Sequence, residues 1–448
     1  MNNATVPGRS ERDMTQQQPT DWKSPEMVAR IRKRYRSEKL FRLLGLVAMT
    51  FAALFLAFLL FTMVRNGLPG FQATEIRLHV PYTEQTLGVS AEDVKGPDGL
   101  EVLRSADYGL LPGDTLAAAL GLSTPDEIMD AEGLISQASS AILRDHLLAN
   151  PSLFGQTVPV WVPASSNIDM LKKGNIRRDA PETERRISDT MLRQFETLEA
   201  NGDVRTTFNT RFFTGADSRD PELASVWGAT AGSLLTLFVT LLMSFPIGVL
   251  TAVYLEEFAP KNRITDFIEV NINNLAAVPS IIYGLLGLAV FLGTFGMPRS
   301  APLVGGLTLA LMTLPTIVIA GRVSIRAVPP SIRDAARGIG ASPLQVVFHH
   351  VVPLAMPGIL TGTIIGMARA LGETAPLLMI GMRAFIVDVP RSLEDPATVL
   401  PVQVFLWSDS IERGFVEKTS AAILVLLVFL MLMNGLAIYL RQKFERRW

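Results

Sequence analysis

The chain has 448 residues, of which 48% are hydrophobic and 19% charged, a lower charge content than soluble proteins of this size usually have, which favours a membrane protein. Its net charge of −1 is not the basic balance of a nucleic-acid-binding protein, so we expect no nucleic-acid partner. Because cysteine is absent, disulfides, thiolate nucleophiles and cysteine-ligated metals are excluded.

The N-terminal region has a polar part followed by an apolar part. Residues 1–40 are polar and end in a run of lysine and arginine, which predicts a disordered, basic, cytoplasmic tail. The next run, Leu43 to Val64, has 22 uncharged residues. At about 1.5 Å per residue it reaches about 33 Å, enough for the roughly 30 Å of bilayer hydrocarbon. A cleaved signal peptide has a shorter apolar part, so residues 41–64 are predicted to form a retained transmembrane helix.

Further apolar runs predict a multi-pass membrane protein, surrounded by the lipid bilayer. Lysine and arginine lie before the first run and after the second, fourth and sixth, which is one side of the membrane if each run crosses it once. The positive-inside rule therefore places both termini in the cytoplasm. The later spans are predicted at 227–255, 270–298, 300–321, 351–382 and 419–440.

Residues 65–223 lie between the first two predicted spans and are long enough for an extracytoplasmic (periplasmic) domain. Apolar residues alternate at 76–80 and at 158–162, as they do in strands. We therefore expect a small α+β domain inserted into a helical membrane protein. A role as a spacer or assembly lobe is the simpler interpretation, and sensing of a ligand or partner is the alternative.

Two helices are predicted within this insert. A capping box that begins at Thr124, with proline at the first helical position, predicts a helix running towards Asn150. Apolar residues on one face over 187–198 predict a second helix, which Gly202 closes.

The cytoplasmic loop from Ser331 to Pro353 has the pattern of a docking element. Small residues at Ala335 and Ala336 are followed by a turn at Gly340 and a partly apolar second half, which suits insertion into a groove on another protein. An amphipathic segment lying on the lipid surface is the alternative. No Gly-Lys dipeptide occurs, so the chain has no phosphate-binding loop of the P-loop ATPases, and any ATPase is a separate chain.

Arg369 and Glu373 are the ionisable residues inside a predicted span, and they lie four apart, within pairing distance on one helical face. A charge inside the membrane should face the bundle interior or a water-filled path. We expect Arg369 to bind a tetrahedral oxyanion and Glu373 to hold it in place or accept a proton. The alternative is an ion pair that fixes helix packing. In the third span, Pro279 beside Ser280 indicates a break or a packing kink.

Enzymatic and metal-binding sites are not indicated. The four histidines lack the spacing of helical metal ligands, and no nucleophile motif of the Gly-x-Ser-x-Gly type is present. We therefore expect a transport subunit that is not an enzyme and needs no cofactor or metal.

The cytoplasmic loop resembles the "EAA" loop of ABC importer permeases. Asp334, Ala335 and Ala336 stand where that motif has Glu-Ala-Ala, and Gly340 and Pro353 take its glycine and terminal proline. Asp334 shortens the acidic side chain, which is a departure from the motif. The resemblance implies a type I ABC importer permease core over 225–447, with a separate ATPase docking on these five residues.

Three further segments resemble phosphate permease subunits of the PstA family. This resemblance implies import of phosphate by a complex with a homologous permease subunit, two ATPase subunits and a periplasmic phosphate-binding protein. It also favours Arg322, otherwise an ordinary anchor at the cytoplasmic end of the fourth span, as a second arginine on the substrate path. The segments are Asn274–Gly284, Arg369–Leu378 and Leu400–Trp407.

Alternatives remain open at this point. Sulfate and molybdate are tetrahedral oxyanions that arginine alone does not separate from phosphate. A secondary transporter working without ATP would need an ion relay and usually has internal repeats, neither of which the sequence indicates. A membrane-anchored receptor would need a cytoplasmic output domain, and the predicted cytoplasmic parts are a tail and loops.

Overall fold

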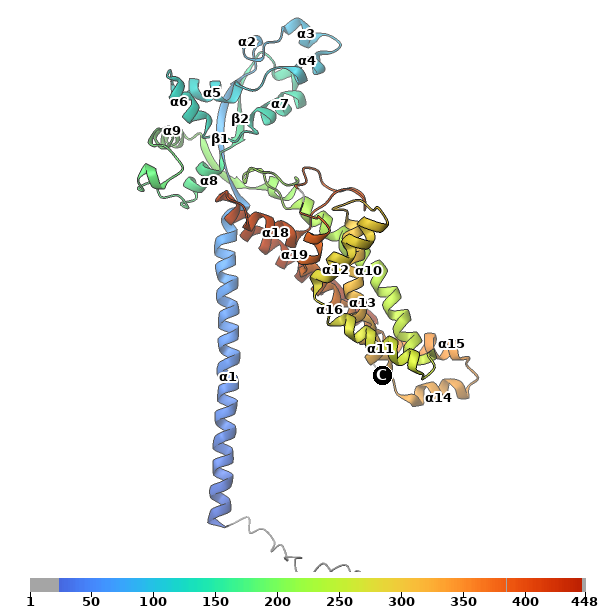
Figure 1. Cartoon of the computed structure of the whole chain (residues 1–448). Helices are drawn as coiled ribbons and strands as arrows, with labels where there is room; N and C mark the ends of the chain where they lie inside the picture. Colours follow the sequence, from blue (N-terminus) through green and yellow to red (C-terminus); the bar gives the residue numbers. More distant parts are fainter. Residues whose placement is uncertain (1–23, 384, 445–448) are drawn as a thin grey trace, which may run out of the picture. The chain divides into compact units, whose positions relative to one another are not determined.

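The computed structural model describes residues 24–383 and 385–444, which divide into two compact units between Thr62 and Met63. The first unit holds most of helix α1, and the second holds the insert and the later membrane helices (Figure 1).

Helix α1 (Pro25–Gly67) is longer than the predicted span. The basic run that was expected to belong to a disordered tail lies inside this helix from Pro25 onward, so that expectation was wrong for residues 25–40. Arginine, lysine, methionine and glutamate are good helix formers, and no proline or glycine interrupts them before Gly45. Glu38 and Arg42 also pair one turn apart. The rest of the expected tail, residues 1–23, lies outside the described residues.

The insert contains a three-stranded antiparallel sheet in the order β2-β1-β3. The predicted strands are confirmed, since Leu78 faces Val160 and Ile76 faces Val162 across the first pair. Ile76 and Leu78 are buried under the helices of the insert, so one face of the sheet forms the core. The strands are β1 (Gln72–Pro81), β2 (Thr157–Pro163) and β3 (Val204–Phe208).

The long helix predicted from Thr124 towards Asn150 is instead two helices, α6 and α7. The chain leaves the helix after Gly133 because Ile135 forms a bridge to Ala164 beside the sheet. The second predicted helix is confirmed as α9, and Gly202 follows it with φ +76°.

The helices of the insert are α2 (Glu84–Leu87), α3 (Ala91–Lys95), α4 (Gly99–Ser105), α5 (Leu111–Leu120), α6 (Pro125–Glu132), α7 (Ser139–Ala149), α8 (Ser166–Lys172) and α9 (Asp189–Ala200). Short 3-10 helices are η1 (Leu68–Phe71), η2 (Pro151–Leu153), η3 (Glu182–Glu184) and η4 (Thr210–Phe213).

In the described residues, five helices are long and apolar enough to cross a membrane, or six if one bent pair counts as a span. The protein is therefore mostly helical, with a small α+β insert, as the sequence predicts. The long membrane helices of the second unit are α10 (Trp227–Val253), α13 (Pro302–Arg326), α16 (Val352–Gly372) and α19 (Gly414–Phe444). The shorter helices are α11 (Arg263–Ala276), α12 (Ser280–Gly287), α14 (Pro330–Gly338), α15 (Pro343–Gln345), α17 (Ala375–Met379) and α18 (Leu400–Ser408). The π-helical turns are η5 (Tyr254–Phe258), η6 (Leu288–Thr294) and η7 (Val346–Val351).

Two predicted spans are interrupted. The run 270–298 bends by 102° between α11 and α12, because Pro279 cannot continue the helix and precedes Ser280 with ψ 137°. The run 351–382 leaves the helix after Gly372, where Glu373 has ψ 118°, and resumes only as the short α17. The prediction of one continuous helix over each of these two ranges was therefore wrong. For the first break, the sequence does contain an indication, which is Pro279.

Buried charges join the insert to the first turn of α19. The Lys173 amine lies 2.5 Å from the Asp169 carboxylate and 3.1 Å from the Glu417 carboxylate. Lys418, also buried, donates a hydrogen bond of 3.3 Å to the Gly70 carbonyl. Since an unpaired buried charge is costly, these contacts fix the insert to the beginning of α19.

Candidate functional site

Arg369 and Glu373 lie where α16 ends. The predicted pair is present, but its Arg369 Nε to Glu373 Oε1 distance is 3.5 Å, at the limit of a hydrogen bond. The Arg369 side chain is 51% exposed, and no other hydrogen bond of Arg369 occurs within residues 24–383 and 385–444. Most of its N–H donors are therefore free to bind another group.

The break in the third span lies next to the segment that follows Glu373. A Cβ on Gly284 of α12 would come within 2.6 Å of Pro376 Cα in α17, so the two short helices pack backbone to backbone. Only glycine permits this approach. The broken helix and the end of α16 therefore form one packed unit.

Arg322 occupies a different kind of site. Its side chain is only 9% exposed, and its guanidinium lies 2.6 Å from the Glu256 carboxylate and 2.6 Å from the Glu269 carboxylate. Glu256 also accepts a hydrogen bond of 2.6 Å from Arg326. This closed network joins η5, α11 and α13, and it leaves Arg322 less able than Arg369 to bind a substrate. The role of Arg322 on a substrate path stays a prediction.

The loop from Ser331 to Pro353 has the helix and the turn that the sequence predicts. Helix α14 ends in a Schellman-type turn, with Gly340 at φ +88° and a hydrogen bond of 3.1 Å from the Ala341 amide to the Ala336 carbonyl. Ala336 is buried on the protein side, whereas Asp334 and Ala335 are exposed. Pro353 lies at the beginning of α16, directly after the π-helical turn η7, with which α16 is continuous.

Large apolar side chains are exposed along this loop, and those of its second half lie on the helix Pro343–Gly372, which is long and apolar enough to cross a membrane. Ile339, beside the turn, is 83% exposed, and Leu344 and Phe348 are exposed in the second half. The sequence indicated the apolar second half but did not single out Ile339.

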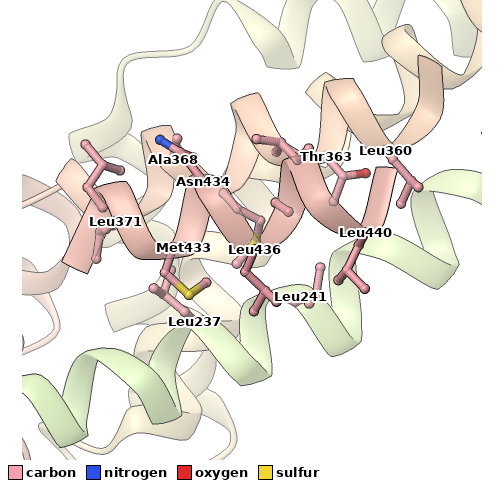
Figure 2. A pocket seen from close by; sticks show the side chains of 14 residues that line it. Leu237, Leu241, Leu360, Thr363, Ala368, Leu371, Met433, Asn434, Leu436 and Leu440 are labelled. Atoms are coloured by element: carbon pink, nitrogen blue, oxygen red, sulfur yellow. The ribbon is translucent and has the colours of Figure 1, made fainter. Parts of the chain in front are cut away.

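An apolar cavity in the second unit lies apart from the charged residues. It has a volume of about 170 Å³ and lies between α10, α16 and α19 (Figure 2). Its lining is aliphatic apart from Thr363 and the Asn434 side chain, and Arg369 is not part of it. Such a surface does not suit an oxyanion, which needs convergent donors.

Sequence reasoning missed the carboxylates that pair with Arg322 and Arg333, which are Glu256, Glu257 and Glu269. They lie just outside the uncharged runs, so they look like ordinary flanking charges. The sequence does place these glutamates at the ends of uncharged runs, and it places basic residues after the fourth span. Their pairing could have been suggested from this arrangement of charges. Glu257, whose side chain is 9% exposed, accepts hydrogen bonds of 2.7 and 3.1 Å from Arg333 of α14.

Comparison with known proteins divides the chain in two. Residues 28–182 match a domain of unknown function, DUF3333. Residues 223–447 match the family described as binding-protein-dependent transport system inner membrane component.

The relatives of the second region include phosphate permeases. The chain is 32% identical over 206 residues to phosphate transport system permease protein PstA 1 of Mycobacterium tuberculosis (strain ATCC 25618 / H37Rv), covering 45% of this chain and 65% of the relative. It is 33% identical over 193 residues to the probable ABC transporter permease protein YqgI of Bacillus subtilis (strain 168), covering 43% and 64%. The chain thus spans just under two thirds of these relatives. With phosphate transport system permease protein PstC of Haemophilus influenzae (strain ATCC 51907 / DSM 11121 / KW20 / Rd), identity is 32% over 222 residues, covering 44% and 69%.

Solved structures resemble the chain only distantly. An inward-facing MetNI methionine ABC transporter covers 49% of this chain and 94% of its own, with 18% identity and a TM-score of 0.37. A bacterial ABC transporter involved in alginate import covers 49% and 79%, with 16% identity and a TM-score of 0.37. These scores are too low to support an inference about function.

The family match at 223–447 includes α10 to α19 and the loop from Ser331 to Pro353, and this region is half of the 448-residue chain. The chain therefore belongs to the binding-protein-dependent transport system inner membrane component family, as a non-catalytic, multi-pass ABC transporter permease of the inner membrane.

Proposed function

We propose that this chain is the permease subunit of an ATP-driven importer that carries inorganic phosphate into the cytoplasm. The main observation in support is Arg369, which lies on a membrane helix. Its side chain is half exposed, and most of the N–H donors of its guanidinium are free. Exposure of such a charge to lipid is costly, so its free side faces a water-filled path or a partner chain. Bidentate hydrogen bonds from arginine suit a tetrahedral oxyanion, and phosphate is the substrate named for several relatives.

The docking loop supports a partner that hydrolyses ATP. Helix α14 offers an exposed carboxylate at Asp334, and the turn at Gly340 exposes Ile339 beside it. A short helix with an apolar tip suits a groove on another protein. We assign this loop, through Asp334, Ala335, Ala336, Gly340 and Pro353, to docking of a separate ATPase subunit.

The rest of the complex follows from this assignment. Two ATPase subunits, a homologous permease subunit and a periplasmic phosphate-binding protein complete the proposed importer. With the docking loop in the cytoplasm, both termini are cytoplasmic and residues 65–223 are periplasmic, in agreement with the basic flanks of the spans.

Phosphate uptake tests this proposal. In phosphate-starved cells that lack the chain, we expect the wild-type chain to restore high-affinity uptake of radiolabelled phosphate. Excess sulfate or molybdate should not compete. Restoration of sulfate or molybdate uptake instead would keep the permease and change the substrate. Uptake that needs no ATPase partner would contradict the ABC importer and favour a secondary transporter.

A further inference from the structure

Arg333 of the docking helix points into the protein, away from the surface that an ATPase would contact. Its guanidinium lies 2.7 Å from the Glu257 carboxylate and donates hydrogen bonds of 2.6 and 2.9 Å to the carbonyls of Val328 and Ile325. On the same helix, Arg337 is exposed, and its one ion pair within residues 24–383 and 385–444 is with Asp334, at 3.7 Å. Arg333 therefore connects α14 to the ends of both α10 and α13, and Arg337 does not.

The π-helical turn η5 directs two neighbouring carboxylates to different helices. Its wide geometry is seen in the hydrogen bond of 2.8 Å from the Ala259 amide to the Tyr254 carbonyl. Glu256 binds Arg322 of α13, whereas Glu257 binds Arg333 of α14. A π-helical turn contains one residue more than a turn of α-helix, so it changes the direction of the side chains that follow. Such turns are frequent at functional sites.

The contacts continue from this turn to the pair at the end of α16. Arg322 joins Glu256 to Glu269 of α11. Helix α11 leads to the break at Pro279, and the helix beyond it packs through Gly284 on α17. Helix α17 directly follows Glu373. Ion pairs and packed short helices thus form an unbroken physical path from the docking helix to Arg369 and Glu373.

We propose that Glu257, paired with Arg333, is the positioning residue that transmits movement of the docking helix to the membrane helices. This inference rests on the proposed function, since it takes α14 as the ATPase contact. The Arg333 and Glu257 side chains are 16% and 9% exposed, and separating them leaves Glu257 without its partner, so we expect the helices that hold the two residues to move together. Energetic coupling between sites is carried by elements of this kind.

The test uses hydrogen exchange in the full chain purified with and without its co-expressed ATPase subunit. In the wild type, ATPase binding should change amide exchange over residues 254–276 by about tenfold, within the usual range for coupled sites. In Glu257→Gln the ATPase should still co-purify, and the change over this range should disappear. The matched control, Arg337→Gln, should keep it. Glu257→Gln preserves the shape of the side chain and leaves Arg333 bonded to its carbonyls, which favours folding; Arg333→Lys is the second variant and should give a partial effect.

Three results would overturn the inference: no exchange change on ATPase binding in the wild type, an unaltered change in both variants, or loss of the ATPase from Glu257→Gln. The last would assign Glu257 to docking alone. None of these results depends on the transported substrate. Failure of phosphate uptake by the wild type therefore remains a separate result, which contradicts the proposed function.

Discussion

Two arginines in membrane helices of the same unit differ in how their charges are satisfied. Arg322 is buried and lies 2.6 Å from each of two carboxylates, whereas Arg369 is half exposed and its one carboxylate, Glu373, is 3.5 Å away. The first arrangement uses the guanidinium to hold three helices together. The second leaves donors free at a helix end. The difference shows that a charge near the membrane identifies a substrate site only when its partners do not already satisfy it.

Arg369→Ala gives the largest expected effect. If the free guanidinium binds the anion, uptake should fall by about a thousandfold, equivalent to about 4 kcal/mol for loss of a buried charge contact. The melting temperature should not change, because the exposed pair with Glu373 contributes little. Radiolabelled phosphate uptake and thermal unfolding measure the two quantities. A large loss of stability with residual uptake would instead make this pair structural and end the contrast with Arg322.

Arg322→Gln should act in the opposite way, mainly on stability. It leaves Glu256 without its buried partner, and breaking such a pair costs about 3 kcal/mol or more. Arg326→Gln is the matched control, since Arg326 binds the same carboxylate from an exposed position, and we expect a loss below about 1 kcal/mol. Unfolding of the purified protein in detergent measures both. If Arg322→Gln is as stable as the wild type and transports poorly, Arg322 belongs with Arg369.

Gly284→Ala tests the packing that places the break in the third span beside the end of α16. The new methyl would lie 2.6 Å from Pro376 Cα, and overpacking of this kind costs about 2 kcal/mol. Gly435→Ala, in α19, meets nothing within 4 Å and should be neutral or slightly stabilising. The comparison is made by thermal unfolding of the two variants. Equal melting temperatures would show that α12 and α17 are not tightly packed.

Much of the fold can be predicted from the sequence, because its strands and membrane helices follow from local patterns of apolar residues. Alternation at Ile76, Leu78 and Val80 predicts a strand that the structure confirms, and the uncharged runs predict the membrane helices. The long helix after Thr124 is wrong because a bridge from Ile135 to a distant part of the chain ends it, and no local pattern records that contact. The break after Gly372 likewise depends on packing against α12.

The charges of the site were predictable as residues but not as partners. The spacing of Arg369 and Glu373 predicts their pairing on one helical face, and the pair is present although Glu373 is the first residue after α16. The partners of Arg322 and Arg333 come from η5 and α11, far away in sequence, so flanking position alone could not reveal them. The roles assigned to these residues remain predictions for the experiments above.

The smallest expected effect concerns a closed ion pair in the insert, outside the membrane spans. The hydrogen bond from Lys172, followed by that from Arg178, lowers the pKa of the partly buried Glu199 below its usual value. A carboxyl whose pKa is lower in the folded state stabilises the protein above the unfolded pKa, about 4.3 for glutamate. This stability is lost as the pH falls through the folded pKa.

Since water screens the pair, Glu199→Gln should cost less than about 1 kcal/mol at pH 7. The difference from the wild type should shrink steadily below about pH 4, measured by unfolding of the intact protein. A difference that does not depend on pH would mean that the Glu199 side chain acts by packing, and that closed charge pairs stabilise this protein chiefly where water is excluded, as at Arg322.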